Sequence, residues 1–275
     1  MTETTHTGCL GIIAGQGDIP QRVMTACQQQ QRPFLVITLS EEANASQYQH
    51  YSHVEIPIAK VGHFLEVMRA HNVEEVVMVG HIKRPVWKEL VPDSLGMKLL
   101  AKIITKKVLG DDTVLSTVVH FLEQHHIRVV GVDTILKDLV APKGVWGNIE
   151  LSSSLTSDID LGKNVLLNLS PFDIGQAVIV YQGQVLGIEG PEGTDQLIHR
   201  CALYRKESKG GILIKMKKRL QERRVDLPTI GVSTIIHAHE AGLVGIVVEA
   251  GECLVVEKEA VVEQADSLGI VLVGI

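Results

Sequence analysis

Short apolar runs alternate with amphipathic stretches along the first half of the chain. In 61–72, apolar residues recur at positions 61, 64, 65 and 68, which is the spacing of one helix face. Another helix is predicted from Pro20 onward. The runs that predict buried strands are 9–15, 33–39, 53–58, 74–80 and 127–133. Strands that alternate with helices in this way are typical of a mostly parallel, doubly wound sheet.

The second half has a different pattern. Residues 137–157 contain several Pro, Gly and Ser residues, which interrupt the helix and strand pattern. We interpret this stretch as a linker between two domains. Beyond it, 176–190 and 245–257 each alternate around a glycine-containing turn, as hairpins do. Further helices are expected at 194–206, 233–242 and 258–269, and further strands at 211–216 and 270–275. The pattern therefore predicts an α/β protein with a doubly wound, mostly parallel N-terminal domain, 1–136, and a smaller mixed α/β C-terminal domain, 158–275.

Composition narrows the class of protein. The chain has 275 residues, 45% apolar residues and only 4% aromatic residues, so Val, Ile, Leu and Ala must build the core. A net charge of −6 argues against a general nucleic-acid-binding protein. The four cysteines, at 9, 27, 201 and 253, lack the spacing of a zinc site or disulfide framework. With no signal-peptide pattern and no 18-residue apolar stretch, we expect a soluble protein of the cytoplasm.

The first candidate site is the glycine loop "AGQGDIP". Gly15, Gly17 and Asp18 follow a predicted strand and precede a helix, where backbone N–H groups favour a phosphate. A dinucleotide site would need a third glycine, and Pro20 takes that place. A phosphate contact, a dinucleotide site that also uses Glu41 or Glu42, and a tight structural turn all stay open.

Basic residues follow the strand at 74–80. Lys83 and Arg84 stand at its carboxyl end, where two cations suit a diphosphate, although they also fit a solvated loop. Residues 95–107 carry lysines at intervals of four and apolar residues on another face. Such a helix can lie on an anionic membrane, line an acyl pocket, or be an ordinary half-buried helix.

Carboxylates recur at predicted helix starts. One of Asp111 and Asp112 is explained by helix capping, which leaves the other for Mg²⁺ or a substrate hydroxyl. Glu192, Thr194 and Asp195 repeat this arrangement, and capping accounts for only one of the three.

Asp226 lies in "RRVDLPTIG", between two arginines and a Leu-Pro turn. Pro228 excludes a helix interior and a paired strand, so the segment is predicted to be an ordered loop. Its alternatives are a structural Arg–Asp pair and a functional acid. Carboxylates and cations on loops of both halves are what a phosphoanhydride hydrolase needs, because metal and cations neutralise phosphate charge and carboxylates hold metal or water.

Five motifs in this order give the chain a family resemblance: "LGIIAGQGDIP", "VGHIKRP", "GDDTVL", "EGTD" and "RRVDLPTIG". From Leu10 to the C-terminal "VLVGI", the sequence resembles the UDP-2,3-diacylglucosamine diphosphatases of the alphaproteobacterial type, which act in lipid A synthesis. The resemblance implies Mg²⁺-dependent cleavage of a lipid-linked UDP-sugar to 2,3-diacylglucosamine 1-phosphate (lipid X) and UMP. It also implies water attack on the sugar-side phosphorus, a Rossmann-like domain and a distinct C-terminal domain with the lipid product between them, a homodimer, and transient contact with the inner membrane.

The resemblance also implies roles for particular residues. Asp226 matches the most probable catalytic acid, with a metal-binding or water-positioning role, and places that acid in the C-terminal domain. Glu222 stands where an aspartate is expected in the family loop, which leaves the metal coordination open. The remaining matches are Asp195 and Asp112 as catalytic acids, Glu192 as a second metal ligand, and Gly15, Gly17, Asp18, Lys83, Arg84, Thr194, Arg224 and Thr229 as substrate-binding residues. Two rival functions remain, a nicotinamide or flavin oxidoreductase and a non-catalytic sensor of nucleotide or UDP-sugar lipid.

Overall fold

The structure is a computed structural model that describes residues 8–40, 45–82, 86–106, 111–204, 209–219 and 221–275. The chain divides into two compact units. The first comprises 1–136 together with 222–226, and the second comprises 137–221 and 227–275. Within the described ranges, no helix is long and apolar enough to cross a membrane.

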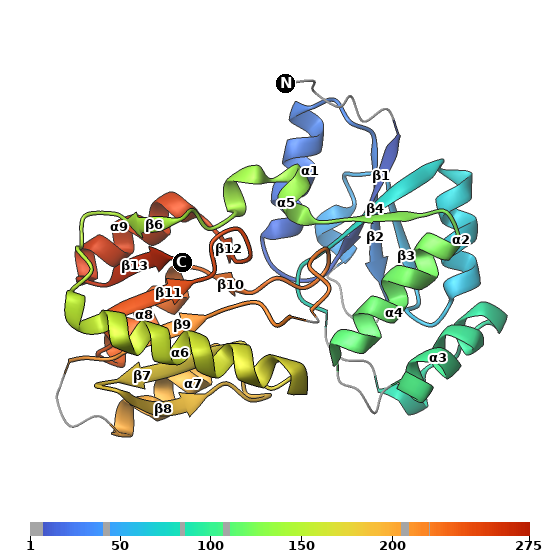
Figure 1. The fold of residues 1–275 in the computed structure, drawn as a ribbon. Coiled ribbons are helices and arrows are strands. Elements are labelled where there is room, and N and C mark those ends of the chain that lie inside the picture. Colours follow the sequence, from blue (N-terminus) through green and yellow to red (C-terminus); the bar gives the residue numbers. More distant parts are fainter. Residues whose placement is uncertain (1–7, 41–44, 83–85, 107–110, 205–208, 220) are drawn as a thin grey trace. The chain divides into compact units, whose positions relative to one another are not determined.

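The first unit contains a five-stranded, fully parallel sheet (Figure 1). Its strands are β1 (Cys9–Ala14), β2 (Phe34–Leu39), β3 (His53–Ile56), β4 (Val73–Val79) and β5 (Arg128–Val130). Their spatial order is β3-β2-β1-β4-β5, the order of a Rossmann-type half sheet. The predicted doubly wound parallel sheet is therefore confirmed.

Helices pack around this sheet. α1 (Ile19–Gln29) contacts β1 and the short α5 (Val132–Ile135). α2 (Val61–Ala70) contacts β4, α4 (Asp111–Gln124) contacts β5, and α3 (Ser94–Lys106) packs against both α2 and α4. The described part of this unit also contains two 3₁₀ turns, η1 (Ala45–Tyr48) and η2 (Trp87–Glu89). Ile37, Met68 and Val119 are fully buried in the core that these helices share with the sheet.

The second unit contains a mixed six-stranded sheet in the order β6-β13-β11-β9-β7-β8. β9, β11 and β13 are mutually parallel, whereas β6, β7 and β8 run antiparallel to their neighbours. The bounds are β6 (Gly144–Trp146), β7 (Ala177–Tyr181), β8 (Gln184–Ile188), β9 (Ile212–Lys215), β11 (Gly245–Val248) and β13 (Val271–Gly274). A separate parallel pair joins β10 (Thr229–Ile230) to β12 (Leu254–Val255).

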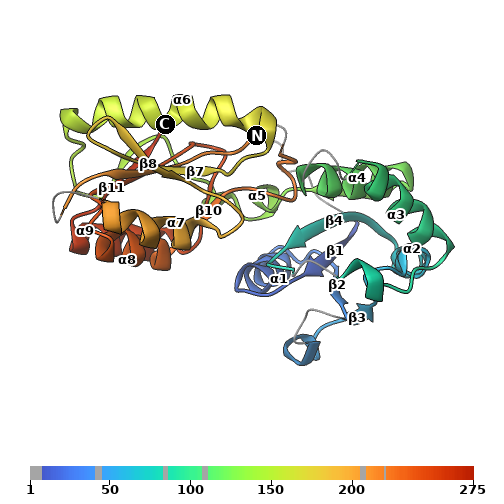
Figure 2. The ribbon, with the colours of Figure 1, turned by 90° about the horizontal axis from the view of Figure 1, so that it is seen from below.

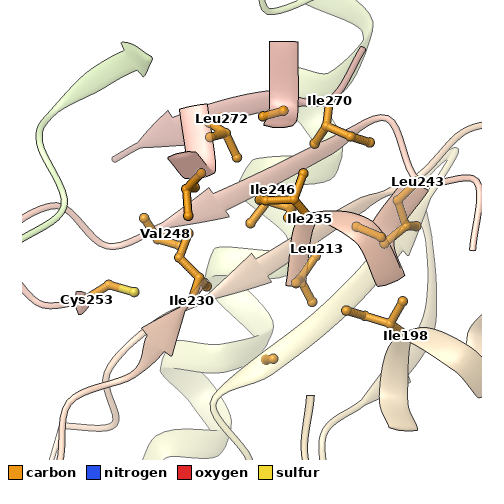
Figure 3. Close-up of a cluster of buried hydrophobic side chains, with 14 of the residues drawn as sticks. Ile198, Leu213, Ile230, Ile235, Leu243, Ile246, Val248, Cys253, Ile270 and Leu272 are labelled. Atoms are coloured by element: carbon orange, nitrogen blue, oxygen red, sulfur yellow. The ribbon is translucent and has the colours of Figure 1, made fainter. Parts of the chain in front are cut away.

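Four helices cover the two faces of the mixed sheet. α6 (Thr156–Leu169) lies on one face, and α7 (Thr194–Cys201), α8 (Val232–Glu240) and α9 (Lys258–Leu268) lie on the other (Figure 2). Figure 3 shows the apolar cluster under these three helices, where Leu213, Ile235 and Ile246 meet. The remaining short turns are η4 (Lys137–Leu139), η5 (Ser153–Leu155), η6 (Ser170–Phe172) and η7 (Ala202–Tyr204).

Of the two predicted hairpins, one is confirmed. β7 and β8 pair antiparallel around Gln182 and Gly183, which both have positive φ, as the favoured two-residue hairpin turn requires. The hairpin predicted at 245–257 is wrong, because β12 pairs with β10 and not with β11. β11 already has a parallel neighbour on each side, β9 and β13, so it offers no open edge to the strand that follows it.

The stretch expected as a linker contributes to the second sheet. β6 pairs antiparallel with β13, and the Trp146 ring is buried with its indole N–H donating to the Pro142 carbonyl (2.9 Å). α6 begins at Thr156, before the predicted start of the C-terminal domain. Residues 137–157 thus form an edge of the second unit.

Candidate functional site

The segment around Asp226 is an ordered turn, as predicted. The backbone N–H groups of Val225 and Asp226 both donate to the Glu222 carbonyl, at 3.1 and 3.0 Å. The turn is followed by an extended stretch through Pro228 into β10. Residues 222–226 pack with the first unit, so Asp226 lies there and not with the C-terminal unit in which it was expected.

Both arginines before Asp226 are held by other carboxylates. Arg223 Nη1 lies 2.7 Å from Asp133 Oδ2 on α5. Arg224 donates to both Glu222 oxygens (2.8 and 2.9 Å) and also pairs with Glu123 on α4. Hydrogen bonding to Glu222 raises the pKa of Arg224, and the same contact lowers the pKa of Glu222. The arginines therefore fix the turn to α4 and α5, and a substrate role for Arg224 stays a prediction.

These ion pairs hold the turn in place, and the half-buried Asp226 lies at its end. Asp226 is neither fully buried nor fully exposed. A carboxylate on an ordered turn can hold a metal ion or a water molecule in a fixed position without being sealed in the core. This geometry suits the functional interpretation of Asp226.

The glycine loop is tied to the end of β4. Gly15 N–H donates to the Val79 carbonyl (2.8 Å), and Gln16 and His81 exchange two backbone hydrogen bonds of 2.8 Å. A Cβ atom on Gly15 would lie 2.5 Å from the His81 carbonyl oxygen, so close packing alone explains this glycine. Gly17, with φ +106°, precedes Asp18 at the start of α1.

This arrangement limits how the loop can bind phosphate. Two of its N–H groups, those of Gly15 and Gln16, already have backbone partners. A phosphate would therefore have to bind to the N–H groups of Gly17 and of the α1 N-terminus. That is fewer donors than a full dinucleotide fingerprint supplies. The contacts of Gly15, Gly17 and Asp18 with substrate stay predictions.

Several predicted site residues have no described side chain. Lys83 and Arg84 lie outside the described residues, as do Glu41 and Glu42. Asp112 belongs to the first turn of α4, but only its backbone is described. The helix predicted at 95–107 is confirmed as α3.

A buried polar cluster lies in the second unit where several loops meet. Lys215, the last residue of β9 and 6% exposed, donates to Thr194 Oγ1 (3.0 Å) and to the Thr229 carbonyl (2.9 Å). The Thr194 hydroxyl in turn donates to Glu189 Oε1 (2.6 Å). Glu189 Oε2 accepts the Gln176 backbone N–H (2.9 Å). Two predicted substrate-binding residues, Thr194 and Thr229, are thus joined through Lys215.

Lys215 and Glu189 were not predicted as site residues from the sequence. The signal was present in "GILIKM", where a lysine follows three consecutive aliphatic residues of a buried strand and a charged group at such a position needs partners. Cys253 also lies near this lysine, but burial raises its pKa to about 12, so the thiol is protonated and not a nucleophile at neutral pH.

The two other predicted acids of this unit each lie beside a basic side chain. Glu192 Oε1 accepts from Arg200 Nε (3.2 Å) and Nη2 (3.0 Å). The pKa of Glu192 lies below its ordinary value, first because its own backbone N–H donates to the carboxylate and then because of Arg200. Asp195 Oδ1 lies 3.2 Å from His237 Nδ1.

These contacts bear on the expected Mg²⁺ ion. Among the described residues, no group of three or more His, Cys, Asp and Glu side chains could hold a metal. Mg²⁺ is commonly held by one or two carboxylates together with water and substrate phosphates, so such a group is not required. Asp226 fits this role by its chemistry and partial burial, whereas Glu192 would first have to release Arg200. The metal roles of both acids stay predictions.

Comparison with known proteins covers both units. A family model described as the LpxI N-terminal domain matches residues 9–139, and one described as the LpxI C-terminal domain matches residues 142–273. A curated relative from Caulobacter vibrioides, named UDP-2,3-diacylglucosamine pyrophosphatase LpxI, is 36% identical over 272 residues. The match covers 97% of each chain.

Proposed function

The chain belongs to the LpxI family, and on that premise we propose that it hydrolyses the pyrophosphate of UDP-2,3-diacylglucosamine in lipid A synthesis. The observation that carries the proposal is the match to the Caulobacter vibrioides pyrophosphatase along 97% of both chains. The matched residues include both units. The family resemblance of the five sequence motifs supports the same substrate.

The proposed products are lipid X and UMP. The oxygen of water bonds to the sugar-side phosphorus while the bond from that phosphorus to the bridging oxygen breaks. The bridging oxygen leaves with UMP, and the oxygen from water stays in lipid X. Asp226 accepts a hydrogen bond from the attacking water and takes its proton, which suits a carboxylate on an ordered turn.

Mg²⁺ is part of the proposal, with Asp226 as its protein ligand of first choice. When bound, the ion would withdraw charge from the diphosphate oxygens and hold the phosphates in line with the water. The fixed turn between Glu222 and Asp226 would then keep the acid in place, because Arg223 and Arg224 anchor it to α5 and α4. A homodimer and transient contact with the inner membrane stay predictions.

Hydrolysis in ¹⁸O-labelled water tests the proposal. Purified protein is incubated with UDP-2,3-diacylglucosamine and either Mg²⁺ or EDTA. The masses of the UMP and lipid X produced are then measured by mass spectrometry. We expect UMP release that needs Mg²⁺ and one ¹⁸O atom in lipid X. Label in UMP would keep the hydrolase and overturn the direction of attack. Absence of release would overturn the proposed activity and favour a binding protein.

A further inference from the structure

The exposed apolar side chains of the first unit belong to one segment of the chain. Among the described residues of that unit, the large apolar side chains that are exposed are Val86 (57%), Val91 (71%), Met97 (59%) and Ile104 (63%). All four lie between residues 86 and 104, in the stretch that leads into α3 and in α3 itself. Single exposed apolar residues are ordinary, but a group of them in one segment is typical of a contact surface.

α3 has a buried apolar face and an exposed one. Leu99 and Ile103 are buried in the core of the unit, whereas Met97, Ala101 and Ile104 are exposed. The exposed three follow one another at intervals of four and three residues, so they form one stripe along the helix. In Figure 1, α3 lies at the margin of the first unit, beside α2 and α4. The stripe therefore faces away from the core.

The start of α3 is fixed by close contacts. Asp93 accepts the backbone N–H groups of Gly96 on α3 and of Gly62 on α2, both at 2.7 Å. A Cβ atom on Gly96 would overlap the Ala59 carbonyl oxygen, so the helix lies directly against that backbone. These contacts set the rotation of α3, and the outward stripe is part of the ordered fold.

Lysines flank the stripe on one side. The 13 residues of α3 include three lysines and no acidic residue, in a chain whose net charge is −6. Lys98 and Lys102 are exposed, and each directly follows a residue of the stripe. Lys102 Nζ donates to Gln124 Oε1 (3.4 Å), but among the described residues no carboxylate forms an ion pair with either lysine. Both charges are available to an anionic partner.

The composition of this face favours a lipid surface over a protein partner. The cores of protein interfaces are enriched in aromatic residues and arginine and depleted in lysine, whereas α3 has three lysines and neither an aromatic residue nor an arginine. A second copy of the same face would bring lysine against lysine without an acid on the helix to pair with. On a bilayer, lysine ammonium groups can meet lipid phosphates while the apolar side chains enter the boundary of the acyl layer.

We propose that the outer face of α3, formed by Met97, Lys98, Ala101, Lys102 and Ile104, docks on a bilayer that contains anionic lipid. The proposal is independent of the proposed function, because it concerns the lipid surface and not the substrate molecule. Docking of this kind brings the protein to the layer in which a lipid-linked substrate is dissolved.

Vesicle flotation of the full chain tests the proposal. Vesicles of phosphatidylcholine alone are compared with vesicles of phosphatidylcholine and phosphatidylglycerol in equal parts, and neither kind contains a UDP-sugar lipid. We expect binding to the anionic vesicles that weakens as salt is raised, because salt screens exposed charges. Equal binding to both kinds of vesicle, or binding to neither, would overturn the proposal whether or not the protein hydrolyses its proposed substrate.

Two matched pairs of lysine substitutions locate the surface. Lys98→Gln combined with Lys102→Gln should weaken binding to the anionic vesicles by roughly tenfold or more, since each lysine near such a surface contributes about fivefold. Lys143→Gln combined with Lys163→Gln removes the same two charges from exposed positions of the second unit and should leave binding nearly unchanged. Equal weakening by the two pairs would show an effect of net charge alone and overturn the assignment to α3.

Ile104→Ser tests the apolar stripe. It should weaken vesicle binding by about tenfold, because an aliphatic side chain no longer leaves water. Leu203→Ser removes an aliphatic side chain that is 81% exposed in the second unit, and it should have no such effect. All substituted positions are exposed, so circular dichroism should give melting temperatures within a few degrees of the unsubstituted protein. If Ile104→Ser instead abolished self-association in sedimentation velocity and left vesicle binding unchanged, the face would join two copies and the bilayer proposal would be overturned.

Discussion

Asp226 follows a turn in which each arginine holds a different carboxylate. Arg223 pairs with Asp133, and Arg224 pairs with Glu222 and Glu123. The charges that stabilise the turn are therefore supplied by its own neighbours in the first unit. Asp226→Asn leaves the residues of both pairs unchanged.

Asp226→Asn should lower kcat by roughly 10²–10⁴-fold, because it removes the carboxylate that we propose as proton acceptor and metal ligand but keeps the shape of the side chain. The melting temperature should stay within a few degrees of the unsubstituted protein. Steady-state UMP release and circular dichroism melting measure the two quantities. Asp160→Asn, on the exposed side of α6, is the matched control and should change neither.

The opposite result would identify a structural acid. If Asp226→Asn unfolded the protein at a much lower temperature while the folded fraction kept its turnover, the role of Asp226 would be to stabilise the turn.

Lys215 illustrates a residue whose first role is in the fold. Its ammonium group satisfies the Thr229 carbonyl and the Thr194 hydroxyl, and through the latter it is linked to Glu189. Lys215→Met should lower the free energy of unfolding by about 2–5 kcal/mol, because it leaves the Thr194 hydroxyl and the Thr229 carbonyl without this donor and removes the ammonium group from the cluster that contains the buried Glu189. Urea unfolding measures the loss. Lys163→Met, on an exposed position of α6, should change stability by less than about 0.5 kcal/mol. A Lys215→Met protein of full stability but no turnover would contradict the structural role and indicate direct substrate contact.

At the scale of elements, Asp93 joins the starts of two helices. Its carboxylate accepts the backbone N–H groups of Gly62 and His63 on α2 (2.7 and 3.3 Å) and of Gly96 on α3 (2.7 Å). Desolvation acts to raise the pKa of this carboxyl, but the backbone donors together hold it below its usual value of 3.8. One side chain thus caps two helices of the first unit.

Asp93→Ala should lower the free energy of unfolding by about 1–2 kcal/mol, since both helix starts lose an acceptor. The folded-state pKa is depressed, so this contribution is complete above the unfolded-state value and is lost as pH falls through the lower folded-state value. Urea unfolding at pH 7 and pH 5.5 should therefore give the same difference from the unsubstituted protein. Glu66→Ala, on the exposed face of α2, serves as the control. A difference that vanished at pH 5.5 would contradict the depressed pKa.

How far the sequence predicted each element depended on whether its signal was local. The strands of the first sheet and the β7–β8 hairpin have local signals, an apolar run or a Gln-Gly turn, and were predicted. α6 was not predicted, and its sequence contains Gly162, a residue that is unfavourable in a helix interior. The structure explains that glycine: a Cβ atom there would lie 2.6 Å from Ile214 Cδ1, so its absence lets α6 approach the sheet. The pairing of β12 and the partners of Lys215 depend on residues distant in sequence, which no local pattern encodes.

At the scale of the whole molecule, residues that pack into one unit are not all contiguous in sequence. The first unit takes five of its residues, 222–226, from a point far beyond its other residues. The boundary expected from composition followed the chain, so it assigned Asp226 to the C-terminal domain. Composition and periodicity give information only about residues that are close in sequence. They could not predict that residues 222–226 pack with the first unit, because the two segments are remote in sequence.

The detached segment also has a consequence for how the protein is made. At ~5–20 residues per second, a ribosome needs roughly 5–20 s to pass from residue 136 to residue 226. During that interval α4 and α5 have been synthesised, but Glu123 and Asp133 still lack the arginines that neutralise them. We expect stalled nascent chains that end near residue 150 to be cleaved more readily by protease in α4 than full-length chains, and equal protection at both lengths would contradict this. The acid proposed for catalysis would thus be placed by one of the last steps in completing the first unit, so that an unfinished chain holds no working site.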